Sequence, residues 1–365
     1  MKVLYLLPAL SSGGVEQVVL ELCQGLSARG VECVVCSAGG SMVSEIEAAG
    51  ARHIRLPIEK KSLRLVLQVR ALAKLMRREK PDILHVHSRI PAWVAHFALK
   101  LMPQRPALVS TFHGFHSVNA YSSIMTHGDA VVTVSRCMRE HILTHYKKVQ
   151  PEHICVIPNS VDIERNYPGF TPSAEWMQRW QQERPELQGA FTLCLPGRIS
   201  RIKGCAHLIP ILTGLRAKGI PAHAVVVGET KRSKVKVRRE LEKAFELAGL
   251  TPHVSWLGHR KDLREVLSAC DVTLSLTLQP ESFGKTTLEA LALGRPVAGY
   301  EHGGVGEQLD QFLPDGKIPV GDTRAMVERL AEWYHTPPKL AKPVGSPYRR
   351  QDMIDAHLAL YQTLL

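Results

Sequence analysis

The sequence predicts an α/β protein of two domains, each built on a doubly wound parallel sheet. Short β-branched runs alternate with helical patterns along nearly the whole chain, which is typical of βαβ units whose sheets are covered on both faces. At 365 residues the chain is too long for one ordinary core, which indicates two domains of similar size. Hydrophobic residues make up 45% and charged residues 22%, and this balance argues against a disordered or fibrous chain.

The predicted strands share short, apolar, mostly β-branched runs. In the first half they cover residues 3–7, 31–37, 83–87, 107–111, 130–134 and 154–157. After a proline-containing stretch without this rhythm, they cover residues 191–197, 224–227, 254–257, 272–276 and 296–299. We therefore predict a first domain of residues 1–168, a second domain of residues 169–347, and a last helix within residues 348–365 that crosses back to the first domain.

The charge balance limits the classes of partner. A formal net charge of +12 indicates an anionic partner such as nucleic acid, a phosphorylated sugar or anionic lipid. Aromatic residues make up only 6% and do not interleave with the basic runs, so we predict no nucleic-acid partner. The apolar start of the chain ends at Pro8 and fits a buried strand better than a signal peptide, and no stretch reaches the ~18 apolar residues of a membrane span. We expect a cytoplasmic protein, with attachment to the inner face of the cell membrane left open.

Cys33 and Cys36 form a Cys-x-x-Cys pair inside a predicted strand. Side chains three residues apart on a strand point to opposite faces of its sheet. We therefore predict two reduced thiols that pack as small hydrophobes, and not a zinc or redox site.

A first polar cluster lies in residues 195–204, which we expect to end a strand and to open a helix. It contains Arg198 and Lys203. A diphosphate is stabilised by a bidentate guanidinium, a point-charge ammonium and a helix N-terminus together. We assign Arg198 and Lys203 as a diphosphate clamp, with a solvated basic loop as the alternative.

A second polar cluster, residues 281–289, also follows a predicted strand and begins a helix. Ligands of open α/β sheets bind outside the carboxyl ends of the strands. Glu281 is expected just before the helix, and Glu289 offers two acceptor oxygens to the hydroxyls of a ribose. The alternative for each glutamate is a carboxylate that stabilises the helix dipole. Backbone amides for an anion are expected from Phe283, Gly284, Lys285 and Thr286.

Two other nucleotide-binding motifs are incomplete. The phosphate loop Gly-x4-Gly-Lys-Thr needs a glycine at position 279, where the sequence has Gln279 followed by Pro280, so we exclude a kinase or NTPase loop. No Asp-x-Asp pair occurs, and this pair is the usual carboxylate clamp for a divalent metal on a nucleotide sugar. Leaving-group charge would then be met by cations and amides, so we expect no metal and no cofactor.

Histidines follow or lie within strands of the first domain. His113 and His116 come after a strand, so one of them is a candidate to hydrogen-bond a sugar hydroxyl or a phosphate, with a structural role as the alternative. His85 and His87 alternate within another strand. We expect one of these two to face the core and both to be structural.

The ordered set of motifs resembles the retaining family-4 glycosyltransferases (glycosyl transferases group 1) of GT-B fold. The resemblance spans nearly the whole chain. Its motifs are Gly13-Gly14, Pro81-Asp-Ile-Leu-His-Val-His87, Val134-Ser135, Ile157-Pro-Asn159, Gly197-Arg198, Lys203-Gly204, Glu281 with Glu289, Ala290-Leu-Ala-Leu-Gly294-Arg-Pro296 and Gly303-Gly-Val-Gly-Glu307. The resemblance implies two Rossmann-like domains facing across a cleft, with the acceptor mainly on the first and a nucleotide-diphosphate sugar, most often a UDP-sugar, on the second.

The resemblance also implies roles for the site residues. Arg198 and Lys203 would bind the diphosphate, Glu289 the ribose and Glu281 the transferred sugar. His113 would contact the sugar from the first domain. The implied reaction is hexosyl transfer with retained anomeric configuration and without metal.

Gly13 and Gly14 lie between the first predicted strand and the first helix. Glycine lets a backbone approach a ligand closely. The resemblance assigns to Gly14 the place of the glycine that brings the first loop near the donor phosphate.

Eight cations of the first domain fall on or around one predicted helix. They are Lys60, Lys61, Arg64, Arg70, Lys74, Arg77, Arg78 and Lys80. Such a face is attracted to an anionic membrane by about 1 kcal/mol per cation near the surface. A second basic run covers residues 231–239. We hypothesise an enzyme that extends a lipid-linked glycan or lipopolysaccharide, with solvated helix faces as the alternative for both runs.

Two other functions stay open at this point. A sugar-nucleotide epimerase on the same fold would use the donor site without an acceptor. A basic nucleic-acid-binding protein would account for the net charge alone. The residues that distinguish one sugar from another lie in loops without a readable pattern.

Overall fold

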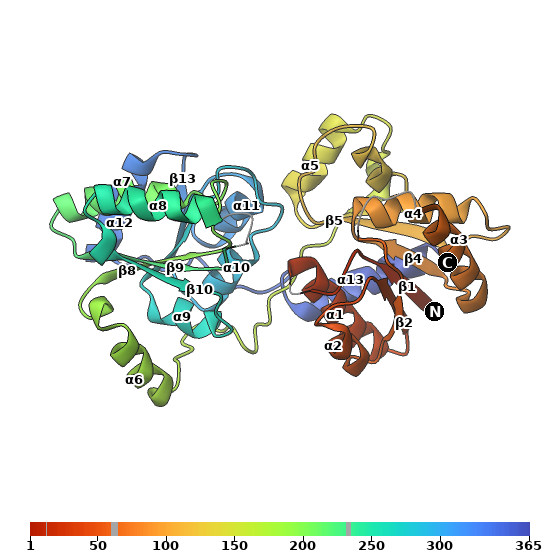
Figure 1. Ribbon diagram of the computed structural model, residues 1–365, viewed down its shortest axis with the longest axis horizontal. Helices are drawn as coiled ribbons and strands as arrows, with labels where there is room; N and C mark the ends of the chain where they lie inside the picture. The colour runs from red at the N-terminus through yellow and green to blue at the C-terminus, as the bar shows by residue number, and fades with distance from the viewer. Residues whose placement is uncertain (12, 60–64, 231–234) are drawn as a thin grey trace. The chain divides into compact units, whose positions relative to one another are not determined.

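The computed structural model describes residues 1–11, 13–59, 65–230 and 235–365. The chain divides into two compact units (Figure 1). Unit 1 comprises Met1–Ser160 and Ser346–Leu365, and unit 2 comprises Val161–Gly345, so the changeover lies before the predicted boundary at residue 168. Each unit contains one parallel sheet with helices packed on it, which confirms the predicted α/β class with two doubly wound domains.

Unit 1 is built on a seven-stranded parallel sheet of order β3-β2-β1-β4-β5-β6-β7. Its strands are β1 (Lys2–Leu6), β2 (Glu32–Ser37), β3 (Arg52–Arg55), β4 (Ile83–Val86), β5 (Ala107–Phe112), β6 (Ala130–Thr133) and β7 (Ile154–Val156). Its α-helices are α1 (Gly14–Ser27), α2 (Val43–Ala48), α3 (Leu65–Glu79), α4 (Arg89–Leu99), α5 (Arg136–His145) and α13 (Arg350–Thr363). Each predicted strand is present to within two residues at either end, whereas β3 carries no apolar run that would predict it.

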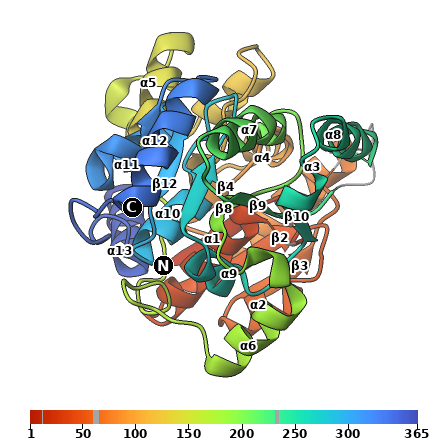
Figure 2. The same cartoon turned by 90° about the vertical axis from the view of Figure 1, so that its left-hand side faces the viewer.

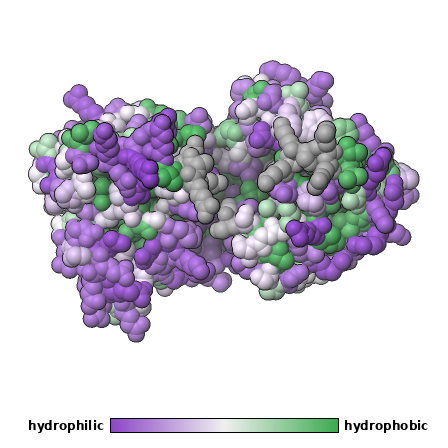
Figure 3. All heavy atoms as spheres, viewed as in Figure 1, coloured by the Kyte–Doolittle hydropathy of each residue, from purple (hydrophilic) through white to green (hydrophobic). Residues whose placement is uncertain are grey.

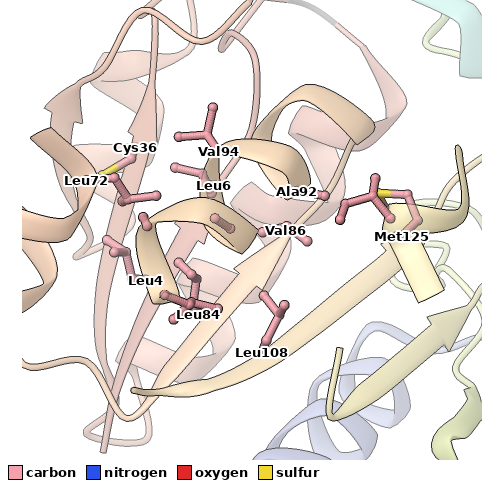
Figure 4. Packing of buried hydrophobic residues seen from close by; sticks show 14 of the residues in the cluster. Leu4, Leu6, Cys36, Leu72, Leu84, Val86, Ala92, Val94, Leu108 and Met125 are labelled. Atoms are coloured by element: carbon pink, nitrogen blue, oxygen red, sulfur yellow. The ribbon is translucent and has the colours of Figure 1, made fainter. Parts of the chain in front are cut away.

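β1 sends alternate side chains into two separate clusters. Leu4 and Leu6 pack with residues of α3 and α4 on one face of the sheet (Figure 4), and Tyr5 packs with residues of α1 and α13 on the other. A fully buried leucine stabilises the fold by about 2 kcal/mol relative to an exposed one. Cys36 lies in the first cluster and Cys33 in the second, so the two thiols point to opposite faces as predicted.

α13 packs on α1 of unit 1 although it follows unit 2 in the chain (Figure 1). Ile354 fills the space beside Gly25, where an added Cβ would lie 2.1 Å from Ile354 Cδ1. The hydroxyl of the fully buried Tyr361 lies 2.7 Å from His85 Nδ1 and 3.3 Å from the Tyr5 hydroxyl. The predicted return of the last helix to the first domain is confirmed.

Both His85 and His87 are buried, which corrects the expectation that only one of them faces the core. The reason is that side chains two residues apart on a strand lie on the same face of its sheet, so His85 and His87 are buried together. The two ring centroids lie 4.2 Å apart, and that of His357 from α13 lies 5.9 Å from His85. Burial lowers the pKa of His85 and His87 well below the usual 6.5 and that of His357 to about 4.

Unit 2 is built on a six-stranded parallel sheet of order β10-β9-β8-β11-β12-β13. Its strands are β8 (Phe191–Pro196), β9 (Ala222–Val227), β10 (Val254–Gly258), β11 (Val272–Ser275), β12 (Val297–Tyr300) and β13 (Lys317–Ile318). Its α-helices are α6 (Ala174–Glu183), α7 (Leu208–Ala217), α8 (Val235–Leu247), α9 (Leu263–Ala269), α10 (Lys285–Ala292), α11 (Gly303–Phe312) and α12 (Thr323–His335). Figures 1 and 2 show α7, α8 and α12 along one face of this sheet and α9 on the other.

Local side-chain caps fix where some helices begin. The Ser173 hydroxyl accepts the Trp176 amide at the start of α6, and the Asp322 carboxylate accepts the Ala325 amide at the start of α12. Such caps are worth about 1 kcal/mol each. Within the described ranges, no helix combines the length and the apolar character that crossing a bilayer requires.

The buried histidines predict loss of stability in acid. Between about pH 6.5 and pH 4, His357 is protonated in the unfolded chain but neutral in the folded chain. The free energy of unfolding therefore falls as the pH is lowered. His357→Leu removes this proton and should make the slope shallower by up to about 1.4 kcal/mol per pH unit. Chemical denaturation across this pH range measures the slope. An unchanged slope in His357→Leu would contradict the prediction.

Candidate active site

β8 and β11 are neighbours in the sheet of unit 2, so the loops that follow them start at the same edge. The two loops contact each other. The Leu278 amide donates to the Ile202 carbonyl oxygen at 2.7 Å. The Lys203 ammonium forms a salt bridge with the Glu281 carboxylate. The structure thus brings together two residues that the sequence places in separate clusters.

The Lys203–Glu281 pair is mostly shielded from solvent, with 30% of the lysine side chain and 18% of the glutamate side chain exposed. Burial and the neighbouring Arg198 guanidinium lower the pKa of Lys203 to about 8. The carboxylate in contact acts in the opposite direction and favours the ammonium form. Because a half-buried cation needs a counterion, the pair is charged near neutral pH, and Arg198 adds an exposed cation on the same loop.

The loop after β8 does not lead directly into a helix, which corrects the expectation for residues 195–204. α7 begins only at Leu208, after a 3-10 turn. Gly204 adopts a φ of 68°, and a Cβ there would lie 2.0 Å from the Leu276 carbonyl oxygen. Close packing against the loop after β11 therefore dictates a turn here. Lys203 is thus presented by this turn and not by the first turn of α7.

α10 starts directly after the Glu281 loop, as expected. Its N-cap is Gly284, with a φ of 82°, and Lys285 and Thr286 form its first turn, half-buried. The first N–H groups of an α-helix have no partner within the helix and carry the positive end of its dipole. Glu289 is the fifth residue of α10 and is half-buried.

Residues that the sequence does not single out hold the Glu281 loop in place. The Thr277 hydroxyl donates to Glu281 Oε1 at 3.1 Å, and His302 Nε2 donates to the Thr277 carbonyl oxygen at 2.6 Å. The side chain of Phe283 is buried, and its carbonyl oxygen accepts from Gln308 Nε2 at 2.7 Å. His302 and Gln308 belong to the start and the body of α11, so no local pattern around Glu281 predicts them.

Gly303 and Gly304 bring α11 against the backbone of Glu281. The Gly304 amide donates to the Glu281 carbonyl oxygen at 2.7 Å. Gly303 has a φ of 63°, and a Cβ there would lie 2.3 Å from the same oxygen. The motif that starts at Gly303 is the one sequence signal for this support.

The other predicted site residues lie in unit 1. Gly13 is the N-cap of α1 with an extended backbone, and Gly14 is its first residue, where an added Cβ would meet nothing within 4 Å. His113 follows β5, and its Nε2 lies 2.9 Å from His87 Nδ1. Burial lowers the pKa of His113 to about 3 and that of His116 to about 4, so both imidazoles are neutral near pH 7.

The polar groups of unit 2 suit an anionic ligand. They comprise an exposed guanidinium, a half-buried ammonium and the N-terminus of α10, all on the loops after two adjacent strands. Among the described residues, no three histidine, cysteine, aspartate or glutamate side chains are arranged to hold a metal ion.

Two family models match the chain, one after the other. The model described as Glycosyltransferase Family 4 matches residues 12–165, and the model described as Glycosyl transferases group 1 matches residues 177–347. The chain belongs to the family-4 glycosyltransferases. This confirms the family that the ordered motifs resemble.

Solved structures show the same fold. A glycosyltransferase from Rickettsia africae superposes with a TM-score of 0.87 at 22% identity, covering 100% of this chain and 98% of its own. HepE from Anabaena, in complex with UDP-glucose, superposes with a TM-score of 0.76 at 18% identity, covering 99% and 95%. At these identities the likeness concerns the fold alone, and it confirms the predicted GT-B architecture.

A curated relative is more similar in sequence over a shorter stretch. The α-maltose-1-phosphate synthase of Mycolicibacterium smegmatis is 27% identical over 248 residues, which are 64% of this glycosyltransferase and 61% of the relative. The match thus spans less than two thirds of the relative's length.

Gly303→Ala should lower the free energy of unfolding of this glycosyltransferase more than Gly249→Ala does, although both place an alanine at a positive φ. Gly249 has a φ of 67° and open space around it, so Gly249→Ala carries the cost of a left-handed alanine alone, about 1–2 kcal/mol. Gly303→Ala adds the collision with Glu281, a further loss of at least about 1 kcal/mol. Urea denaturation of both variants measures the difference. If both variants lose the same free energy of unfolding, the Glu281 loop moves aside without cost and the prediction is wrong.

Proposed function

We propose that this glycosyltransferase moves a sugar from a UDP-sugar to a hydroxyl of a cell-surface glycan or glycolipid, such as lipopolysaccharide, with retained configuration and without metal. The observation that carries the proposal is the Lys203–Glu281 pair beside Arg198, at the edge where ligands of open α/β sheets bind. A UDP-sugar is favoured because HepE, of the same fold, holds UDP-glucose.

The cations would act on the leaving group. As the bond between the sugar and the diphosphate breaks, negative charge grows on the diphosphate oxygens. Arg198, Lys203 and the first amides of α10 would stabilise that charge with preorganised donors, which is often the largest catalytic contribution. The lack of an Asp-x-Asp pair supports a reaction in which these groups take the place of a metal ion.

Glu281 would change partners when the donor binds. Without a donor, its carboxylate neutralises Lys203. A diphosphate would replace it as the counterion of Lys203, which leaves the carboxylate to accept hydroxyl groups of the transferred sugar. Its position would be kept by the Thr277 hydroxyl and the Gly304 amide. Glu289 would bind the ribose.

Residues of unit 1 would complete the donor contacts. The proposal gives His113 a hydrogen bond to the transferred sugar, and Gly13 and Gly14 a backbone contact with the donor. A neutral imidazole suits this role because it offers one donor and one acceptor without a charge of its own.

A basic and apolar surface on α3 and α4 supports a membrane-bound acceptor. It comprises exposed apolar side chains and cations, namely Val66, Leu67, Phe97, Leu101, Arg70, Lys74, Arg77 and Lys100. The two helices are joined where Arg77 donates to the Leu101 carbonyl oxygen at 2.6 Å. In Figure 3 the right-hand part of the view, where Figure 1 places α3 and α4, shows hydrophobic next to hydrophilic residues. Cations beside apolar side chains fit the headgroups and acyl chains of an anionic bilayer, at the inner face of the cell membrane.

The other cations named in the sequence give less support to membrane binding. Lys60, Lys61 and Arg64 lie outside the described residues, as do residues 231–234 of the second basic run. On α8, Arg238 pairs with Glu242 and lies 3.8 Å from the centroid of the Trp256 ring, so it serves the fold of unit 2.

Arg198→Ala should weaken the binding of both UDP and inorganic pyrophosphate by about 10- to 100-fold, because each loses charge-assisted hydrogen bonds of about 1.5–3 kcal/mol. Glu289→Ala should weaken the binding of UDP but not that of pyrophosphate, because pyrophosphate has no ribose. Isothermal titration calorimetry of the full chain measures both.

The matched control is Arg201→Ala, on the same loop, whose guanidinium pairs with Glu240 at 2.8 Å and should not bind the donor. If Arg198→Ala and Arg201→Ala bind UDP equally well, the proposed diphosphate clamp is wrong. Isomerised sugar nucleotide without transfer, in an assay without acceptor, would instead indicate an epimerase.

The membrane part is tested by flotation with vesicles that contain anionic lipid at low salt. Arg70→Glu with Lys74→Glu should weaken vesicle binding by at least about 30-fold, since each cation contributes about 1 kcal/mol. Arg239→Glu with Lys243→Glu on α8 changes the net charge equally and should have a much smaller effect. Equal effects of the two pairs would show that net charge, and not the α3–α4 surface, decides membrane binding.

A further inference from the structure

His87 and His113 form a pair at the carboxyl edge of the sheet in unit 1. Each follows its strand directly, His87 after β4 and His113 after β5, and these strands are neighbours. His87 Nδ1 lies 2.9 Å from His113 Nε2, and the rings meet edge to edge, with centroids 5.2 Å apart and planes 23° apart. One of the two facing nitrogens must therefore carry a proton and the other a lone pair.

The surroundings of His87 decide which nitrogen carries the proton. The side chain of His87 is 3% exposed, and its Nε2 has no hydrogen-bond partner among the described residues. The adjacent His85 cannot supply one, because its own nitrogens are taken by Tyr361 and Thr111, each at 2.7 Å. An unpaired buried N–H is rarer than an unpaired acceptor. His87 is thus best satisfied with its proton on Nδ1.

We propose that His87 is a positioning residue that donates from Nδ1 to His113 Nε2 and thereby fixes His113 as the tautomer protonated at Nδ1. A neutral imidazole has one N–H, so His113 then has its lone pair facing His87 and its donor on the opposite side of the ring. The acceptor suited to that donor is an oxygen of a sugar hydroxyl or a phosphate. His113 acts as a fixed hydrogen-bond donor and not as a base.

This inference rests on the proposed function only for its effect on transfer, because the tautomer itself is a property of the free enzyme. The hydrogen bond with His87 also holds the ring of His113 close to the plane of the His87 ring, and burial keeps both rings neutral. A donor with a fixed direction suits a hydroxyl that must lie in one place during transfer.

The tautomer is measured by ¹⁵N NMR of the full chain labelled at histidine. The chain has 17 histidines, so the His113 signals are assigned by their loss in His113→Gln. The expected spectrum shows a protonated Nδ1 and an unprotonated Nε2 for His113. A protonated Nε2 in the wild-type protein would overturn the proposal, and this measurement requires no variant of His87.

Two substitutions separate positioning from simple packing. The amide nitrogen of an asparagine takes the place of Nδ1, so His87→Asn should keep His113 protonated at Nδ1 and keep kcat/KM within about 3-fold of wild type. His87→Leu removes the donor and should lower kcat/KM by roughly 10-fold, the value of one lost hydrogen bond. Binding of UDP alone should be the same in all three proteins.

Two results would count against the role in transfer. If His87→Asn loses as much kcat/KM as His87→Leu while both stay folded by circular dichroism, positioning by a donor is wrong. If the wild-type protein transfers no sugar from any nucleotide sugar, the proposed function fails, while the ¹⁵N spectrum still decides whether His87 sets the tautomer.

Discussion

All strands of both sheets run parallel, and this constraint decides where the polar groups of the site lie. A parallel strand has to be followed by a crossover through a helix, so the carboxyl ends of all strands meet at one edge of the sheet. Helices on both faces leave the strands themselves nearly all apolar. Reactive side chains are therefore confined to the loops after strands. Lys203 follows β8, Glu281 follows β11 and His113 follows β5.

This constraint explains how much of the molecule could be predicted from the sequence. A strand buried on both faces is a continuous apolar run, which is a local signal, and the residues just after such runs are the candidates for a site. Arg198, Lys203 and Glu281 were recognised on that ground. The edge strand β3 could not be recognised. Its residues Arg52–Arg55 are exposed or half-buried, and they contain no apolar run.

Contacts between distant parts of the chain account for what the sequence does not reveal. The turn that presents Lys203 is imposed by the approach of Gly204 to Leu276, and the position of Glu281 depends on Thr277 and on the start of α11. His87 is buried beside His85 because the two side chains share one face of the sheet, and α13, from the far end of the chain, contacts His85 there through Tyr361.

The return of α13 to unit 1 has a consequence for biosynthesis. Unit 2 is continuous in the chain, whereas unit 1 needs Ser346–Leu365, which the ribosome makes after all of unit 2. While those residues are missing, the groove on α1 that takes Ile354 is open to water, and His85 lacks the Tyr361 hydroxyl. Unit 2 can thus form all of its internal contacts as soon as it is synthesised. Unit 1 is complete only after the last helix has been made.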